Sequence, residues 1–298
     1  MLRIHNKLIF KLFLIVLLIS TAGCASSIAK ISVDGMRPIM EAMHHTTNKN
    51  QDVRLVKESM PTFMVQMDGF IEVSPENRFL LTQAAESCIG YAFLFVEDIE
   101  PERAKHLYLK GKNYALRVLE MNESFRQALE QDDLVVFRNA LKGIHKKDTS
   151  ALFFVINGWL SWIHLAHIDN PKALKDLPKV EAMMNRLLEM DDTYKFGGAH
   201  ALYGVYYVSI PEMFGGNFAQ AEVHFKEAFE ISKSKYLLWD FLYARYYATA
   251  RKDKALFIET LKRIMAAPDD LCPEEAFVNA AIKQKASDLL LKVNDYFL

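Results

Sequence analysis

Apolar residues recur at helical spacing along almost the whole chain, whereas signals for β-strands are nearly absent. No run alternates Val, Ile and Thr with polar residues, and no Asn-Gly turn joins two strand-like runs. The first clear helical pattern contains Met60, Met64, Met67 and Ile71. It stops at Ser74-Pro75 and a second pattern restarts at Asn77, so the spacing predicts two helices that form a hairpin.

The same periodicity predicts further helices down the chain. One opens with Pro101 in its first turn, where the missing N–H does no harm, and runs to Leu119. The others are expected at 134–144, 151–167, 174–190, 198–208, 218–232, 237–250, 254–266 and 273–296. Their connections are short and contain Asp, Asn, Gly or Pro, which favours an all-α protein of antiparallel helix pairs.

Residues after 203 follow the order of small and aromatic positions in a tetratricopeptide repeat. These positions are Gly204, Tyr207, Ala221, Phe225 and Ala228. The turn between the two helices, 210–217, is longer than in a standard repeat. The pattern therefore predicts a degenerate TPR-like superhelix, an architecture whose concave surfaces or grooves serve binding rather than bond-making.

The N-terminus has the features of an export signal. A basic start precedes the apolar run 12–19, which is too short to span a bilayer, and Thr21-Ala22-Gly23-Cys24 then places small residues before a cysteine. This pattern predicts a lipoprotein signal peptide at 1–23 and lipidation of Cys24. Ordinary secretion, with cleavage near Ala22 or Ala25, is the alternative.

The predicted organisation after the signal is a tether and one domain. The lipidated cysteine and tether occupy 24–34, and a single all-α TPR-like domain occupies 35–298. Ala25 stands where some Gram-negative lipoproteins carry an Asp that retains them in the inner membrane. The expected location is therefore the periplasmic side of a bacterial membrane, with the outer membrane favoured.

Composition allows a large core and argues against a nucleic-acid partner. Hydrophobic residues make up 51% of the chain, and the formal net charge of -1 comes from interspersed acids and bases rather than a basic stripe. Cys88 lies in an apolar helical pattern and Cys272 in a loop between prolines. A buried free Cys88 is favoured over a disulfide with Cys272, and the pairing is left open.

Candidate catalytic and metal motifs are weak. The chain has no H-E-x-x-H, G-x-S-x-G or Walker sequence, so neither a catalytic residue nor a cofactor is expected. His164 and His167 share a helix face but lack an acidic or Cys ligand at suitable spacing, and the adjacent His44-His45 pair diverges, so no metal site is expected. Gly215-Gly216-Asn217 is interpreted as a turn with Asn217 capping the next helix, rather than as an anion site.

Aromatic residues form the strongest binding signal. Their apolar bodies and polar tips suit a groove that holds an apolar ligand with a polar head. The ligand-binding hypothesis places Trp159, Trp162, Tyr206 and Tyr207 in the wall of such a groove. The alternative for each of these residues is ordinary core packing.

Several polar and glycine positions carry a resemblance to a known family. They are Gly69-Phe70-Ile71-Glu72, Ser74-Pro75, Asn77, Ala84-Ala85, Pro101-Glu102-Arg103-Ala104, Leu107-Tyr108, Pro211, Phe214-Gly215-Gly216, Ala221-Glu222, Phe225, Asn279, Ala281, Lys285-Ala286, Leu289-Leu290 and Phe297. With these residues the chain resembles the T-component (TatT-like) lipoproteins of tripartite ATP-independent periplasmic (TRAP) transporters, over nearly the whole mature sequence.

The resemblance implies a function that the periodicity does not. It implies a homotrimer of helical-repeat lipoproteins, whose apolar grooves or pores face the periplasmic substrate-binding P subunit and hand it a hydrophobic or organic-acid ligand. The expected function is thus a lipid-anchored accessory component of solute uptake and not an enzyme. The alternative is an envelope lipoprotein scaffold that joins proteins without a transport role.

Overall fold

The computed structural model describes residues 27–167, 169–210 and 212–297. The predicted signal peptide at 1–23 and the predicted lipidation site at Cys24 lie outside these residues. In the described part of the chain every regular element is helical, which confirms the all-α class. Residues 27–35 are also helical and lead into α2.

The first half of the chain contains two helices that the apolar pattern did not predict, α2 and α6. Its elements are α2 (Arg37–Asn48), α3 (Val53–Val73), α4 (Arg78–Tyr91), the π-helical η1 (Ala92–Val96), α5 (Pro101–Leu119), α6 (Glu123–Glu130) and α7 (Leu134–Leu141). The break at Ser74-Pro75 is confirmed, since the Asn77 side chain accepts a hydrogen bond from the Leu80 N–H and caps α4. Pro101 opens α5 as expected.

The second half follows the predicted boundaries closely. Its elements are α8 (Thr149–Ala166), α9 (Leu177–Met190), α10 (Tyr194–Ser209), α11 (Phe218–Ser232), α12 (Leu237–Leu242), the π-helical η5 (Tyr243–Ala248), α13 (Lys254–Ala266), α14 (Ala276–Leu291) and α15 (Val293–Tyr296). Asn217 caps α11 by accepting from the Gln220 N–H, so the predicted turn and cap are confirmed. The predicted helix at 273–296 is divided by a 3-10 turn at Pro273–Glu275 and a break after Leu291.

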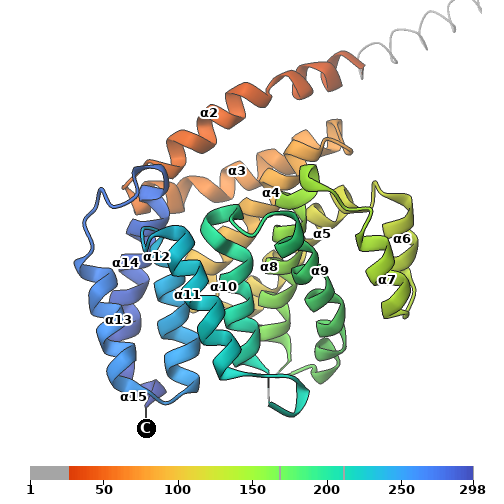
Figure 1. The fold of residues 1–298 in the computed structure, drawn as a ribbon. Coiled ribbons are helices and arrows are strands. Elements are labelled where there is room, and N and C mark those ends of the chain that lie inside the picture. The colour runs from red at the N-terminus through yellow and green to blue at the C-terminus, as the bar shows by residue number, and fades with distance from the viewer. Residues whose placement is uncertain (1–26, 168, 211, 298) are drawn as a thin grey trace, which may run out of the picture.

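Neighbouring helices approach each other closely where one of them carries a glycine. A Cβ on Gly111 of α5 would lie 2.7 Å from Ile89 of α4, and one on Gly204 of α10 would lie 2.7 Å from the Phe225 ring of α11. Figure 1 shows α10 and α11 running side by side, with α2 crossing above α3 and α6 and α7 projecting from one side. The TPR-like superhelix stays a prediction.

The buried apolar side chains form two clusters. One joins helices from α3 to α10, and the other joins α11 to α14 with a few residues of α3, η1 and α10. The stretches Arg78–Val96 and Lys146–Ala166 are long and apolar enough to cross a membrane, but 61% of each is buried within the protein. Packing in the first cluster accounts for their hydrophobicity, because core helices have the same composition.

Candidate ligand cavity and its polar end

A cavity of about 630 Å³ lies where helices from the two clusters meet. Side chains from α2, α3, α4, η1, α8, α10, α12 and α14 line it, and most are apolar. Among them are Met60, Phe63, Phe93, Phe154 and Trp239. Its volume falls in the range of about 300–1,000 Å³ that small-molecule sites occupy, and an apolar wall with a few polar groups is typical of such sites.

A pair of opposite charges marks one polar end of the cavity. The Lys195 Nζ atom lies 2.7 Å from Glu86 Oε1, and both residues line the cavity. Burial would raise the pKa of the Glu86 carboxyl, but Lys195 and His44 outweigh it and lower that pKa. The pair is therefore ionised, and each charge compensates the desolvation of the other.

His44 joins this end from α2. Its Nε2 atom lies 4.0 Å from Glu86 Oε2 and 3.2 Å from the side-chain amide nitrogen of Asn48. Because α2 also contacts the 3-10 turn η6 (Pro273–Glu275) and α14, it covers this end of the cavity.

Lys195 reaches the cavity from an unusual backbone segment. Lys195, Phe196 and Gly197 have φ values of 48°, 57° and 79°, which place three successive residues in the left-handed region. Each non-glycine residue there costs about 1–3 kcal/mol, so surrounding contacts must hold the segment. The Trp239 indole N–H donates a 2.8 Å hydrogen bond to the Phe196 carbonyl oxygen, and the Phe196 ring stacks on Tyr236.

Two further polar side chains at this end lack hydrogen-bond partners within the described chain. Glu275 is 8% exposed and Tyr236 is 6% exposed, and both line the cavity. Burial raises the pKa of the Glu275 carboxyl; Lys195 opposes this rise and Glu86 reinforces it. Burial likewise raises the pKa of the Tyr236 phenol, which stays protonated. Buried polar groups without protein partners are candidates for contact with a ligand.

Of the four residues in the ligand-binding hypothesis, the structure brings Tyr206 to the cavity wall. Trp159 is buried beneath Lys112, whose Nζ atom lies 4.7 Å from the ring centroid. Trp162 is partly buried against the first cluster, and Tyr207 stacks on His224. The four residues therefore do not form one wall, and their role in binding stays a prediction.

The charged residues at the cavity end were not among the sequence candidates. Glu86 lies within the apolar pattern of α4, and Lys195 precedes Gly197-Gly198, a pair that was not interpreted as a special turn. The glycine pair is a local signal for unusual backbone. No local signal links Lys195 to Glu86, which lies 109 positions earlier.

The histidines and cysteines weighed as candidates occupy separate places. His164 and His167 line the cavity with ring centroids 6.1 Å apart, and burial with nearby Arg245 lowers the pKa of His164 to about 4. No group of three or more potential metal ligands occurs in the described ranges. Cys88 and Cys272 are both buried and free, and burial raises the pKa of Cys88 to about 12.

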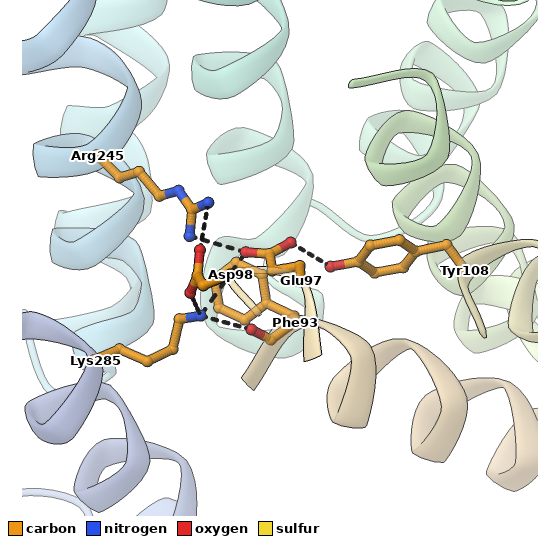
Figure 2. A network of polar contacts seen from close by, with 6 residues as sticks. All are labelled: Phe93, Glu97, Asp98, Tyr108, Arg245 and Lys285. Atoms are coloured by element: carbon orange, nitrogen blue, oxygen red, sulfur yellow. Dashed lines mark hydrogen bonds and ion pairs between the residues drawn. The ribbon is translucent and has the colours of Figure 1, made fainter. Parts of the chain in front are cut away.

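A buried ion network contacts the backbone of Phe93, a residue of the cavity wall. Figure 2 shows Arg245 of η5 between Glu97 and Asp98, with Nη1 2.9 Å from Glu97 Oε1 and Nη2 2.9 Å from Asp98 Oδ1. Lys285 of α14 pairs with Asp98 and donates to the Phe93 carbonyl oxygen at 2.7 Å.

Tyr108 completes this network from α5 by donating a 2.5 Å hydrogen bond to Glu97 Oε2. The contacts thus tie η1, η5, α14 and α5 together, and η1 carries Phe93 into the cavity wall. Two cations face two carboxylates here, and burial raises the pKa of the Glu97 carboxyl against the opposing effect of Arg245 and Lys285. Because these groups bond to one another, the network is assigned a positioning role rather than a ligand-binding one.

Comparison with known proteins relates the chain to a transporter family and to an uncharacterized bacterial protein. A family model described as TRAP transporter T-component matches residues 49–297. An uncharacterized protein of Treponema pallidum (strain Nichols) is 24% identical over 266 residues, which cover 84% of this chain and 82% of that protein. The family match includes the helices that line the cavity from α3 onward.

Proposed function

The chain belongs to the TRAP transporter T-component family, and on that basis we propose that its cavity binds a hydrophobic ligand with a polar head. As a member of this family it is an accessory component of a TRAP transporter, associated with the cell envelope. The single observation that carries the proposal is the apolar cavity of about 630 Å³ with charged side chains at one end. A scaffold that only joined other proteins would not require such a space.

The proposed partner is the substrate-binding P subunit, which exchanges the ligand with this chain. The tether at Cys24 confines the chain to the periplasmic face of a membrane, for which the outer membrane is proposed. Confinement to one membrane face raises the encounter frequency with a periplasmic partner, since the anchor sets a high effective concentration. Assembly into a homotrimer is part of the proposal and derives from the family resemblance.

Affinity capture from detergent-solubilised envelopes tests the partner. We expect mass spectrometry to identify a TRAP P subunit among the captured proteins. Capture of other envelope proteins without any P subunit, from cells that express one, would favour the scaffold alternative. Light scattering on the same preparation tests the trimer, and only monomer at micromolar concentration would contradict it.

Mass spectrometry of small molecules released from the purified chain tests the cavity. We expect an amphipathic molecule that co-purifies with the native protein. The matched control is Gly90→Phe, since Gly90 lines the cavity and a Cβ there meets nothing within 4 Å, so the added ring would fill cavity space. Equal recovery from both proteins would show that the molecule binds elsewhere.

A further inference from the structure

The charged groups that line the cavity are unevenly paired. In the described part of the chain, Lys195 is the one Lys or Arg among the lining residues, and it faces the two carboxylates of Glu86 and Glu275. Lys195 and His44 both lie against Glu86, at 2.7 Å and 4.0 Å. Among the described residues, Glu275 has no basic group within ion-pair distance, so its carboxylate is the unpaired acidic group at this end.

Lys195 is not available to an incoming anion. Its ammonium is already 2.7 Å from Glu86, and separating that pair would leave a largely desolvated carboxylate without its main compensating charge. A ligand carboxylate placed here would also add a third acidic group beside Glu86 and Glu275. The charge arrangement therefore disfavours an organic acid whose head lies at this end.

Glu275, by contrast, is available. Its carboxylate accepts no hydrogen bond from any described residue, the residue is 8% exposed, and it lines the cavity. The Tyr236 hydroxyl beside it is also without a partner among these residues. A cationic ligand that donates hydrogen bonds to Glu275 would satisfy the carboxylate and compensate its charge.

We propose that the cavity takes an apolar molecule with a protonated amine head, and that the head binds at Glu275 beside the Glu86–Lys195 pair. This inference rests on the proposed ligand-binding function of the cavity. The ammonium donates to the Glu275 carboxylate, and the apolar part lies along Met60, Phe93 and Trp239. The raised pKa of Glu275 supports the assignment, because a cation bound there would offset the burial that disfavours its ionised form.

Three probes with the same apolar chain test the head group. Hexylamine, hexanol and hexanoate are titrated calorimetrically into the full chain in detergent micelles, with micelles alone as the blank. We expect the amine to bind about tenfold more tightly than the alcohol, which corresponds to one charge-assisted hydrogen bond, and the acid to bind most weakly. Hexanoate binding as tight as hexylamine would overturn the proposal.

A charge-neutral variant locates the amine. Glu275→Gln is expected to lose about tenfold in hexylamine affinity while its hexanol affinity stays the same. The matched control is Glu274→Gln, which removes the same charge from an exposed neighbour that does not line the cavity. An unchanged preference for the amine in Glu275→Gln would overturn the assignment.

Different outcomes contradict the ligand-binding function of the cavity and its preference for an amine head. If all three probes bind equally, the cavity binds apolar chains and only the head-group inference is wrong. If none of them binds, both the ligand-binding function and the inference are wrong. Tyr236→Phe gives a second variant should Glu275→Gln not fold, and it is expected to weaken hexylamine binding by a smaller factor than Glu275→Gln.

Discussion

The Lys195 ammonium nitrogen lies 2.7 Å from a Glu86 carboxylate oxygen, although 109 positions separate the two residues in the sequence. This pair joins α4 to the start of α10 and forms the polar end of the cavity. It depends on three successive left-handed residues, which the Trp239 indole holds by its hydrogen bond to the Phe196 carbonyl. The strained backbone of residues 195–197 therefore places the Lys195 ammonium beside Glu86.

Removing the positive member of this pair should destabilise the protein. Lys195→Met leaves the Glu86 carboxylate, whose side chain is only 22% exposed, without its main compensating charge, so we expect the free energy of unfolding to fall by roughly 1–3 kcal/mol. Urea denaturation measures this change. Lys226→Met is the control, because its pair with Glu222 is exposed and should matter little. Equal effects from the two variants would show that the Glu86–Lys195 pair is not a buried interaction.

The close approach of α10 and α11 leaves no room for a Cβ atom at position 204. In Gly204→Ala the new Cβ would lie 2.7 Å from the Phe225 ring, so we expect a loss of about 1–3 kcal/mol in unfolding free energy. Gly69→Ala in α3 meets nothing within 4 Å and should stabilise the protein by roughly 0.5–1 kcal/mol. Thermal unfolding of both variants gives the comparison, and a stabilised Gly204→Ala would contradict the packing.

Glu275 should make stability fall as the pH rises. Burial raises its folded pKa above the ordinary value of 4.5, so the folded protein holds this proton more tightly than the unfolded chain does. The stabilisation is complete below pH 4.5 and is lost as the pH rises through the folded pKa. Among the neighbouring charges, Lys195 opposes the raised pKa while Glu86 and Glu274 reinforce it.

Urea denaturation of the native chain and Glu275→Gln across this pH range measures the effect. His44 and Tyr236, which also lie at the polar end, remain in both proteins and cancel in the difference. We expect the native chain to lose unfolding free energy relative to the variant as the pH rises. Parallel pH profiles would mean that Glu275 titrates normally in the folded state.

Two adjacent tyrosines should differ in their effect on ligand binding. Tyr206 lines the cavity, and Tyr206→Ala is expected to weaken hexanol binding by about fivefold to tenfold, since apolar contact area is lost. Tyr207→Ala removes an equal side chain that stacks on His224, outside the lining, and should leave binding unchanged. A larger effect at Tyr207 would place the ligand on the other side of α10.

Cys24→Ala tests the lipid anchor. We expect the variant to appear in the soluble fraction, folded and able to bind the hexyl probes, while cells that depend on it lose uptake. Cys88→Ala is the matched control, because Cys88 is buried in α4 and its loss should not change membrane association. Full uptake by a soluble Cys24→Ala variant would show that the tether is not needed.

Local sequence determined the helices and their ends. The boundaries of α11 and α13 match the predicted 218–232 and 254–266 residue for residue. Asn217 and Asp253 cap these helices through neighbouring backbone N–H groups, so periodicity and capping lie within one stretch of chain. The family resemblance is likewise carried by residues that the sequence alone displays.

Tertiary structure alone decided the composition of the cavity. Tyr206 and Tyr207 are equivalent by residue type, and only the packing of α10 turns one into the cavity and the other toward His224. Similarly, nothing in the sequence distinguishes Glu86 and Lys195 from other charged positions. Only folding brings them together at the polar end of the cavity. The physical reason is range: helix periodicity and caps act within a few residues, whereas desolvation and charge pairing depend on which distant elements exclude water together.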